Sequence, residues 1–206
     1  QSLLIKDDII AEISPEIDES NVDKIIDAKG KILLPGLINT HTHLSMTLFR
    51  GYGENSNFKN WWMDYMRPLE EKFEPDDCYY GATLGMLELL KNGVTTVADF
   101  YLNPHETAKA CADTGIRTNI GIGAITGKEI LSEDSLKSDV DLVSISPLIK
   151  PILYAHSLYS CDESHFHELN KFAVKYGLIK STHVSETLTE VGTIDSKYNM
   201  TPIGLL

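Results

Sequence analysis

The sequence predicts an α/β fold built around a parallel sheet, on two observations. From Gly36 onward, short apolar segments alternate with amphipathic helical segments, which is the pattern of βα units. The helical segments also end next to residues that stop helices, at Asn92-Gly93, Gly115 and Gly177. Five strand segments of this kind fit the first part of a TIM-type (β/α)8 barrel, which needs about 250 residues when complete.

The expected elements divide the chain after residue 34. Residues 1–34 are expected to form a small β module with strands at 2–5, 9–13 and 31–34. Residues 35–206 carry the barrel segment, with strands at 37–40, 94–99, 117–124, 151–155 and 178–182. Its helices are expected at about 76–91, 104–113 and 163–176, with a last one beginning near Thr201. A flavodoxin-like open sheet is the competing architecture, because five parallel strands could also lie flat.

Composition and charge exclude several classes of protein. With 30 acidic and 18 basic residues, the formal charge of -12 would repel a phosphate backbone, so we expect a small-molecule partner and no nucleic acid. No apolar run could cross a bilayer and no leader is apparent, which favours a cytoplasmic protein without a membrane partner. Cys78, Cys111 and Cys161 lack metal-binding spacing, and we expect reduced, mostly buried thiols. Because the chain starts at Gln1 and stops just inside a helix, we expect a piece of a longer protein.

Four histidines stand at the C-terminal ends of expected strands. His41 and His43 follow the first strand, and side chains two positions apart in a strand point the same way. His156 follows the fourth strand and His183 the fifth. Because the C-terminal strand ends of a barrel converge on one mouth, we predict that His41, His43 and His183 hold a divalent metal, with His156 close by. One such histidine alone is equally well explained as a hydrogen-bonded rim residue.

A second pair with the same spacing serves as an internal control. His165 and His167 lie in an expected helix, where side chains two positions apart point in different directions and cannot share an ion. We expect both to be surface residues. We also expect His105, at a helix start, to be solvated.

Glu186 is a candidate for proton transfer. It lies three residues after His183 in a loop, where a carboxylate can act on a substrate beside a metal without being a ligand of that metal. A helix-start carboxylate is the alternative, since Thr182, Ser185 and Thr187 make capping plausible there.

The aromatic segment 61–70 has the composition of a substrate-binding lid. It forms part of a long excursion after the first strand, and loops of that kind usually carry binding function. We expect one of Trp61 and Trp62 to lie in the core and the other to face a planar ligand. Glu70 could accept hydrogen bonds from hydroxyl groups of that ligand.

These motifs together resemble the amidohydrolase superfamily, and within it the branch of 5'-methylthioadenosine/S-adenosylhomocysteine deaminases and related chlorohydrolases. The resembling segments lie in the expected order over nearly the whole chain. They are residues 35–44, 49–52, 68–70, 92–96, 154–157 and 183–187, with Glu190.

The resemblance implies a metal-dependent hydrolytic deaminase of an aminopurine nucleoside, such as 5'-methylthioadenosine, S-adenosylhomocysteine or adenosine. His41, His43 and His183 match three ligands of one divalent metal, for which zinc suits imidazole best and iron also fits. In the implied reaction a metal-bound hydroxide attacks the ring carbon that bears the amine, Glu186 protonates the neighbouring nitrogen, and ammonia leaves. The cytidine-deaminase-like zinc fold is excluded, because it needs a P-C-x-x-C pair that this chain lacks.

The resemblance also implies where the nucleoside binds. His156, Trp61 and Glu70 match positions that contact it, with Glu70 on the ribose hydroxyls, and residues 1–34 match the N-terminal part of a composite β-sandwich. Family members often carry an arginine at the exit of the third strand that pairs with a substrate carboxylate, whereas this chain has Gly121-Ile122-Gly123. This difference favours nucleosides without an amino-acid tail.

Two other functions remain open at this point. The same ligands would serve a triazine or other heteroaromatic chlorohydrolase or aminohydrolase, and a non-catalytic metal- or nucleoside-binding fragment is the third hypothesis. A two-metal amidase is disfavoured, because His156 stands where such an enzyme needs a bridging lysine. The later family strands, which supply another histidine and the aspartate that acts as general base, are missing here, so we expect the isolated chain to be inactive. A homo-oligomer is compatible with the sequence.

Overall fold

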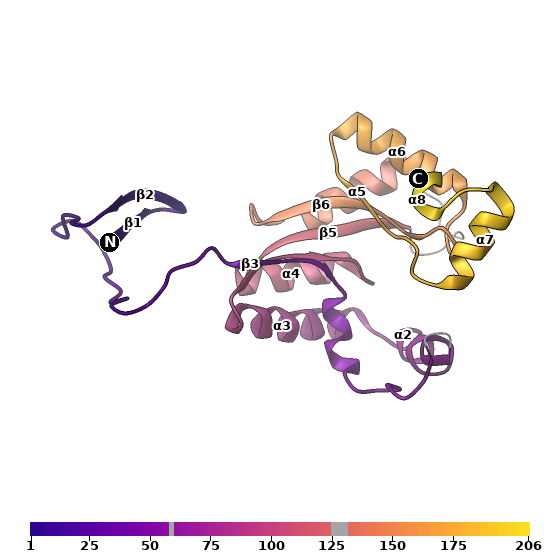
Figure 1. Ribbon diagram of the computed structural model, residues 1–206, viewed down its shortest axis with the longest axis horizontal. Helices are drawn as coiled ribbons and strands as arrows, with labels where there is room; N and C mark the ends of the chain where they lie inside the picture. The colour runs from indigo at the N-terminus through magenta and orange to yellow at the C-terminus, as the bar shows by residue number, and fades with distance from the viewer. Residues whose placement is uncertain (58–59, 125–131) are drawn as a thin grey trace. The chain divides into compact units, whose positions relative to one another are not determined.

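The computed structural model describes residues 1–57, 60–124 and 132–206 (Figure 1). The chain forms two compact units, residues 1–35 and 36–206. No helix in the described part of the chain is long and apolar enough to cross a membrane.

The first unit contains an antiparallel hairpin, β1 (Ser2–Lys6) and β2 (Ile9–Ser14), which turns at Asp7 with φ 57°. The strand predicted at 31–34 is wrong, because no described backbone segment pairs with these residues. Ile32, Leu33 and Leu34 are 87%, 71% and 73% exposed, so apolar sequence alone does not make a strand there. That residues 1–34 belong to a composite β-sandwich stays a prediction.

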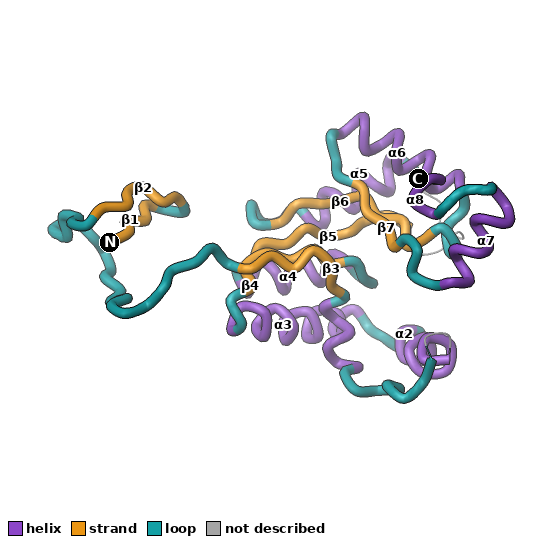
Figure 2. Tube along the Cα trace, in the orientation of Figure 1, coloured by secondary structure: helices purple, strands orange, loops and turns teal. Residues whose placement is uncertain are grey.

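The second unit is built on a five-stranded parallel sheet, which confirms the predicted fold class. Its strands are β3 (Leu37–Thr42), β4 (Val94–Asp99), β5 (Arg117–Ala124), β6 (Ile149–Ser157) and β7 (Lys180–His183). They lie side by side in chain order, which is the order of a partial (β/α) barrel (Figure 2). The flavodoxin-like alternative is excluded, because a doubly wound sheet reverses its strand order at a switch point.

Helices connect each strand to the next. The crossovers are α3 (Pro75–Lys91), α4 (Pro104–Thr114), α5 (Glu133–Val143) and α6 (Glu163–Tyr176), and α7 (Leu188–Tyr198) and α8 (Pro202–Leu205) follow β7. Between β3 and α3 lie η1 (Leu44–Phe49), the π-helix η2 (Trp61–Met66) and α2 (Arg67–Glu70). The helices expected near α3, α4, α6 and α8 are confirmed, whereas α5 and α7 were not predicted.

Local sequence explains the predicted helix ends. Pro75 starts α3, and Glu74 and Asp77 form a capping box across its first turn. Gly115 and Gly177 end α4 and α6 in the left-handed conformation, with φ 75° and 65°. These are the stop positions that the sequence indicated.

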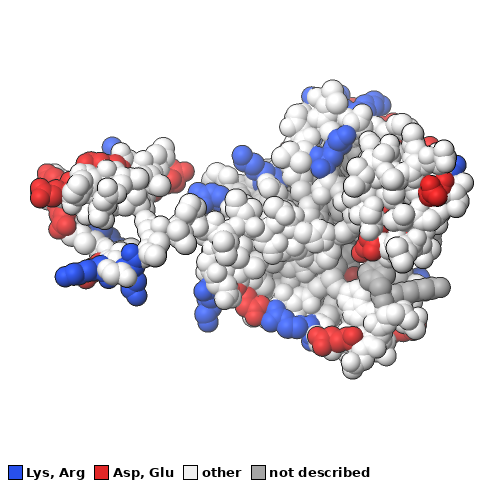
Figure 3. Space-filling model, in the orientation of Figure 1, with Lys and Arg blue, Asp and Glu red and all other residues white. Residues whose placement is uncertain are grey.

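The two faces of the sheet bury different side chains because strand residues alternate between them. Val97 of β4 and Leu153 of β6 belong to the main core, which the helices cover. Ala98, Ile152 and Tyr154 form a second cluster with Phe100 on the other face. In the view of Figure 3 the second unit is hollowed, and its charged side chains lie mainly at the margins of the hollow. The three cysteines are free and buried, as expected.

A close helix contact fixes the segment that follows the first strand. Gly81 of α3 packs on η1 so tightly that a Cβ atom would lie 2.5 Å from the Ser45 carbonyl oxygen. The Ser45 hydroxyl donates to the carbonyl oxygen of Cys78 at 2.9 Å, and Ser45 is fully buried. Since η1 begins one residue after His43, this contact anchors the end of β3.

We expect Gly81→Ala to lower the free energy of unfolding by about 1–3 kcal/mol, because the new methyl group meets backbone that cannot yield. Gly192→Ala is the matched control: Gly192 lies within α7 with no heavy atom within 4 Å of its Cβ position. For this control we expect the free energy of unfolding to rise by up to about 1 kcal/mol, because alanine has a higher helix propensity than glycine. Urea unfolding measures both, and equal effects at the two sites would contradict this account of the α3–η1 contact.

Candidate metal centre

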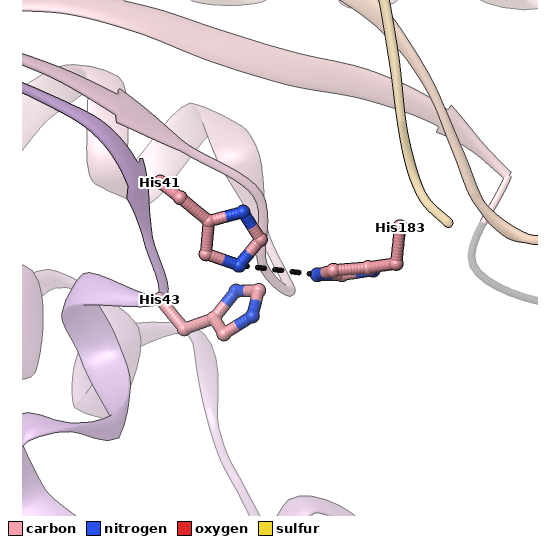
Figure 4. A group of neighbouring side chains, drawn as sticks. All are labelled: His41, His43 and His183. Carbon is pink, nitrogen blue, oxygen red and sulfur yellow. Dashed lines mark hydrogen bonds between the residues drawn. The ribbon is translucent and has the colours of Figure 1, made fainter. Parts of the chain in front are cut away.

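Three imidazoles from the two outer strands of the sheet meet at its carboxyl end (Figure 4). His41 is the last but one residue of β3, His43 follows β3 directly, and His183 ends β7. Their ligand nitrogens all lie within 4.8 Å of one another. The Nε2 atoms of His41 and His183 are 3.2 Å apart, although 142 positions separate these residues.

Backbone carbonyls orient two of the three rings. The Nδ1 atom of His43 lies 2.6 Å from the Phe100 carbonyl oxygen, and that of His183 lies 2.9 Å from the carbonyl oxygen of His156. Because a carbonyl can only accept, each Nδ1 carries the proton and donates it. The Nε2 atoms of these rings are then unprotonated in the neutral side chain, which leaves them available to a metal.

Burial favours the neutral form of three imidazoles at the site, those of His41, His43 and His156. It lowers the pKa of His43 to about 4, and the neighbouring imidazoles act in the same direction. His156, whose ring centre lies 4.8 Å from that of His183, has its pKa lowered to about 4 by burial first. The pKa of His41 is lowered by burial and by His183. The neutral imidazole is the form that binds metal ions.

The spacing of the nitrogens fits a divalent ion. Zinc–nitrogen bonds of about 2.0–2.1 Å at tetrahedral angles place two ligand nitrogens roughly 3.3 Å apart. The 3.2 Å between the Nε2 atoms of His41 and His183 matches that separation. Two unprotonated nitrogens at this distance repel each other unless a proton or a cation lies between them. The donor set therefore supports a divalent metal.

A buried carboxylate supports the strand end that carries two of the histidines. Asp99 is the last residue of β4 and is 1% exposed. Its Oδ1 accepts the Leu44 amide at 2.6 Å and the Thr42 hydroxyl at 3.1 Å. These two residues flank His43, so Asp99 fixes the backbone from which His43 projects. Burial raises the pKa of Asp99 to about 7, although the hydrogen bonds oppose this.

His156 lies in β6, and Glu186 lies in the loop between β7 and α7. Glu186 is exposed and stands directly before Thr187, the N-cap of α7, so it lies at a helix start as the alternative holds, although Thr187 is the capping residue. Its Oε2 accepts the Tyr159 hydroxyl at 2.6 Å, and the Tyr159 and His156 ring centres are 5.7 Å apart. The Nδ1 atom of His156 is 2.9 Å from the Ser160 hydroxyl, which leaves Nε2 as its second polar atom.

The aromatic segment contributes less to the core than expected. Trp61 is half-buried and donates through Nε1 to the Tyr52 carbonyl oxygen at 3.2 Å, and Trp62 is 42% exposed. The prediction that one tryptophan lies in the core is therefore wrong. Met66, at 1% exposure, is the buried side chain of η2 instead.

Glu70 is connected to the histidine cluster through a tyrosine. The Tyr101 hydroxyl donates to Glu70 Oε1 at 2.8 Å, and the Tyr101 ring centre lies 6.0 Å from that of His43. Burial raises the pKa of Glu70, although the bond from Tyr101 opposes the shift.

The internal control behaves only partly as expected. In α6, His167 is exposed, but His165 is 8% exposed and lies on the buried face with Leu169 and Phe172. The surface prediction for His165 is therefore wrong, because positions i, i+4 and i+7 share one helix face. The His105 side chain is 38% exposed beside Glu106, as expected for a solvated residue.

Sequence reasoning missed four residues around the cluster. Asp99 and Tyr101 stand at the end of β4, so the rule that selected the histidines also points to them. Tyr154 precedes His156 by two positions, and its hydroxyl lies 3.2 Å from His183 Nδ1. Tyr159 lies in a loop, where no periodic pattern marks it.

The chain is an α/β protein with a parallel βα sheet, and the histidine cluster at the carboxyl end of that sheet is a candidate metal-binding site. The chain belongs to the amidohydrolase family, because the sequence model of that family matches residues 32–202.

Named relatives cover the whole chain. The present chain is 41% identical to 5'-deoxyadenosine deaminase of Methanobrevibacter smithii, and the match covers 100% of this chain and 48% of the relative. It is 37% identical to 5-methylthioadenosine/S-adenosylhomocysteine deaminase of Dictyoglomus turgidum, over 100% of this chain and 49% of the relative. The chain thus spans about half the length of the curated relatives it matches.

A solved structure supports both the fold and the metal. The chain resembles a mutant of atrazine chlorohydrolase from Arthrobacter aurescens TC1, complexed with zinc and atraton, with TM-score 0.79 and 25% identity. The match covers 98% of this chain and 51% of that one. The bound zinc there and the histidine cluster here together support a divalent metal in this family member.

We expect His43→Ala and His183→Ala, each in the complete natural protein, to lower bound zinc by at least about tenfold, because two imidazoles do not complete the site. His167→Ala is the control, since His167 is exposed on α6 away from the cluster. Elemental analysis after dialysis measures zinc per chain. Full zinc occupancy in either cluster variant, with the control unchanged, would contradict the assignment.

Asp99 is expected to make stability depend on pH. Between its ordinary pKa of 3.8 and the folded value of about 7, the folded chain keeps a proton that the unfolded chain loses. Stability therefore falls as pH rises, with a slope of up to about 1.4 kcal/mol per pH unit. Asp99→Asn removes this pH dependence while keeping an oxygen acceptor. Between pH 5 and pH 7.5 the free energy of unfolding of the variant should therefore rise relative to that of the parent, by about 1–3 kcal/mol. Urea unfolding of both proteins at the two pH values measures this change. An equal difference between parent and variant at both pH values would contradict the raised pKa of Asp99.

Proposed function

We propose that the complete natural protein is a zinc-dependent hydrolytic deaminase of an aminopurine nucleoside. The convergence of His41, His43 and His183 carries the proposal, and Glu186 is bonded to Tyr159, whose ring contacts that of His156. The names of the relatives point to the same chemistry, since both act on adenine nucleosides by name.

In this proposal the three histidines hold the ion, and the neutral state of His41 and His43 favours its binding at pH 7. When bound, a zinc ion supplies a nucleophile near neutral pH, because it lowers the pKa of water toward about 7. Zinc is proposed over iron because the atrazine chlorohydrolase structure contains it and imidazole ligands suit it.

Glu186 is the proposed proton carrier to the purine nitrogen beside the carbon that bears the amine. Its Oε2 accepts the Tyr159 hydroxyl, so Oε1 is the atom left to hold and deliver the proton. A carboxylate held by one hydrogen bond keeps its second oxygen aimed in one direction, which favours transfer to a fixed acceptor.

Three other side chains are proposed to bind the nucleoside. His156 keeps Nε2 for a polar atom of the substrate, since Nδ1 faces the Ser160 hydroxyl. Glu70 uses Oε1 for Tyr101, which leaves Oε2 for the ribose hydroxyls. Trp61 is proposed to offer its ring to the base or ribose.

The arginines of this chain favour substrates without a carboxylate tail. Arg50 pairs with Glu88 at 2.5 Å and Arg67 pairs with Glu71 at 3.0 Å. Arg117 begins β5 and therefore lies at the end of the sheet opposite the histidines. We propose 5'-deoxyadenosine, 5'-methylthioadenosine or adenosine as substrates before S-adenosylhomocysteine.

Hydrolysis of a triazine or another heteroaromatic ring is the second candidate function. The likeness to atrazine chlorohydrolase, with atraton bound in that structure, favours it, and the same histidines would serve. The non-catalytic fragment hypothesis gains weight only if the natural protein ends near Leu206, which the mass of the protein from its source decides.

The test is hydrolysis by the complete natural protein, with nucleosides and triazines offered in parallel. Ammonia release reports loss of an amino group, and chloride release reports loss of a chloro group. We expect turnover of the proposed nucleosides and a loss of about 10²–10⁴ in kcat for Glu186→Gln, because general acid–base groups contribute on that scale. Glu168→Gln, which alters an exposed carboxylate paired with Lys171 on α6, is the control and should change nothing.

The isolated segment 1–206 should show no turnover, because the proposed general base comes from residues outside it. Turnover of triazines alone would replace the proposal by its alternative. Appreciable deamination by segment 1–206, or full activity of Glu186→Gln, would overturn the proposed mechanism.

A further inference from the structure

We propose that Glu190 is a positioning residue that fixes the backbone of Glu186 and so aims its carboxylate. This inference rests on the proposed function, because it concerns the residue that carries the proton. It starts from a buried carboxylate that no step of the proposed reaction uses. Glu190 is 2% exposed, and it lies in the first turn of α7.

Both oxygens of Glu190 are bonded to the loop that carries Glu186. Oε1 accepts the amide of Ser185 at 3.2 Å, and Oε2 accepts the amide of Glu186 at 2.8 Å. These two amides are consecutive, and they lie between the end of β7 and the start of α7. One buried side chain therefore ties the helix to the strand end next to His183.

This arrangement differs from ordinary helix capping in the same chain. At α3, Asp77 in the third helical position accepts the amide of the N-cap residue Glu74 at 3.0 Å, as in a capping box. Glu190 holds the same position in α7, and the N-cap Thr187 accepts the Glu190 amide at 3.1 Å. The Glu190 carboxylate, however, bonds the two amides that precede the N-cap. It stabilises the Glu186 loop rather than the end of the helix.

The loop adopts a conformation that needs such support. Ser185 has φ 58°, in the left-handed region that residues with a side chain rarely occupy. Ser185 is exposed, so side-chain packing does not hold it there. The two hydrogen bonds from consecutive amides to one carboxylate are the interactions that favour this turn.

Two contacts then determine where the Glu186 carboxylate lies. Glu190 fixes its backbone, and Tyr159 holds Oε2. His183 does not depend on Glu190, because its ring is bonded to the carbonyl oxygen of His156 in β6. Loss of Glu190 should therefore impair proton transfer and leave metal binding intact.

The experiment compares Glu190→Gln with the parent in the complete natural protein. An amide offers one acceptor oxygen, so one loop amide loses its partner and meets an NH₂ group instead. We expect kcat to fall at least about tenfold, with KM and zinc content within about twofold, because only the proton carrier moves. Hydrogen exchange of the segment 183–187 should accelerate, while that of β5 stays unchanged.

Rescue separates positioning from a general structural role. Glycine adopts positive φ without strain, so Ser185→Gly added to Glu190→Gln should restore part of kcat. Asp77→Asn is the matched control, because it weakens a capping carboxylate at the same helical position of α3 and should leave kcat unchanged. If Glu190→Gln does not fold, Ser185→Val tests the same turn from the exposed side: a β-branched residue disfavours φ 58°, and kcat should fall.

The exchange measurement distinguishes this inference from the proposed function. If the complete protein deaminates no nucleoside, the proposed function fails, while faster exchange at 183–187 in Glu190→Gln still supports the loop contact. Unchanged exchange in Glu190→Gln would overturn the inference. So would an unchanged kcat in an active protein, or a loss of zinc equal to the loss of kcat.

Discussion

The approach of His41 to His183 is the contact on which the candidate site depends. These residues lie on the two outer strands of the sheet, yet their Nε2 atoms are 3.2 Å apart. A flat sheet of five strands would separate its outer strands by roughly 19 Å, at about 4.8 Å per strand. The sheet must therefore curl until the ends of β3 and β7 face each other across its concave side. Every proposed role of Glu186, His156 and Glu70 presupposes this curvature, because each side chain is placed relative to the paired imidazoles.

The strand ends supply a second layer of polar groups that holds the first. The carbonyl oxygens of Phe100 and His156 fix the Nδ1 protons of His43 and His183, so the strand order that forms the sheet also orients the rings. Asp99 ties the end of β3 to β4, at the cost of a carboxylate with a raised pKa. The raised pKa of buried Asp99 and the lowered pKa values of half-buried His43 and His156 do not favour the folded state. The main core between the sheet and its helices offsets this cost.

The sequence predicted the strands better than the helices. β4 and β5 match their expected bounds, because each begins just after a predicted helix stop, at Asn92-Gly93 and at Gly115. Helix α5 was missed, since residues 133–143 carry few apolar side chains and only Leu136 and Val143 are buried. The strand expected at 31–34 failed for the opposite reason: its residues are apolar but have no pairing partner in the described chain. Periodicity records which residues could be buried, and pairing decides which ones form a strand.

The sequence by itself determined the chemical types of the site and the strand ends that carry them. The histidine spacing at His41 and His43 and the βα alternation are local properties, and they suffice to place side chains at the ends of successive parallel strands. Only the tertiary structure decided that the Glu190 carboxylate reaches the Glu186 loop, that Tyr159 bonds Glu186, and that His165 is buried. The Tyr159 and His165 contacts depend on how the β6–α6 segment packs, and the Glu190 contact depends on the left-handed turn at Ser185. That packing is set by many side chains at once, so no short pattern in the sequence records it.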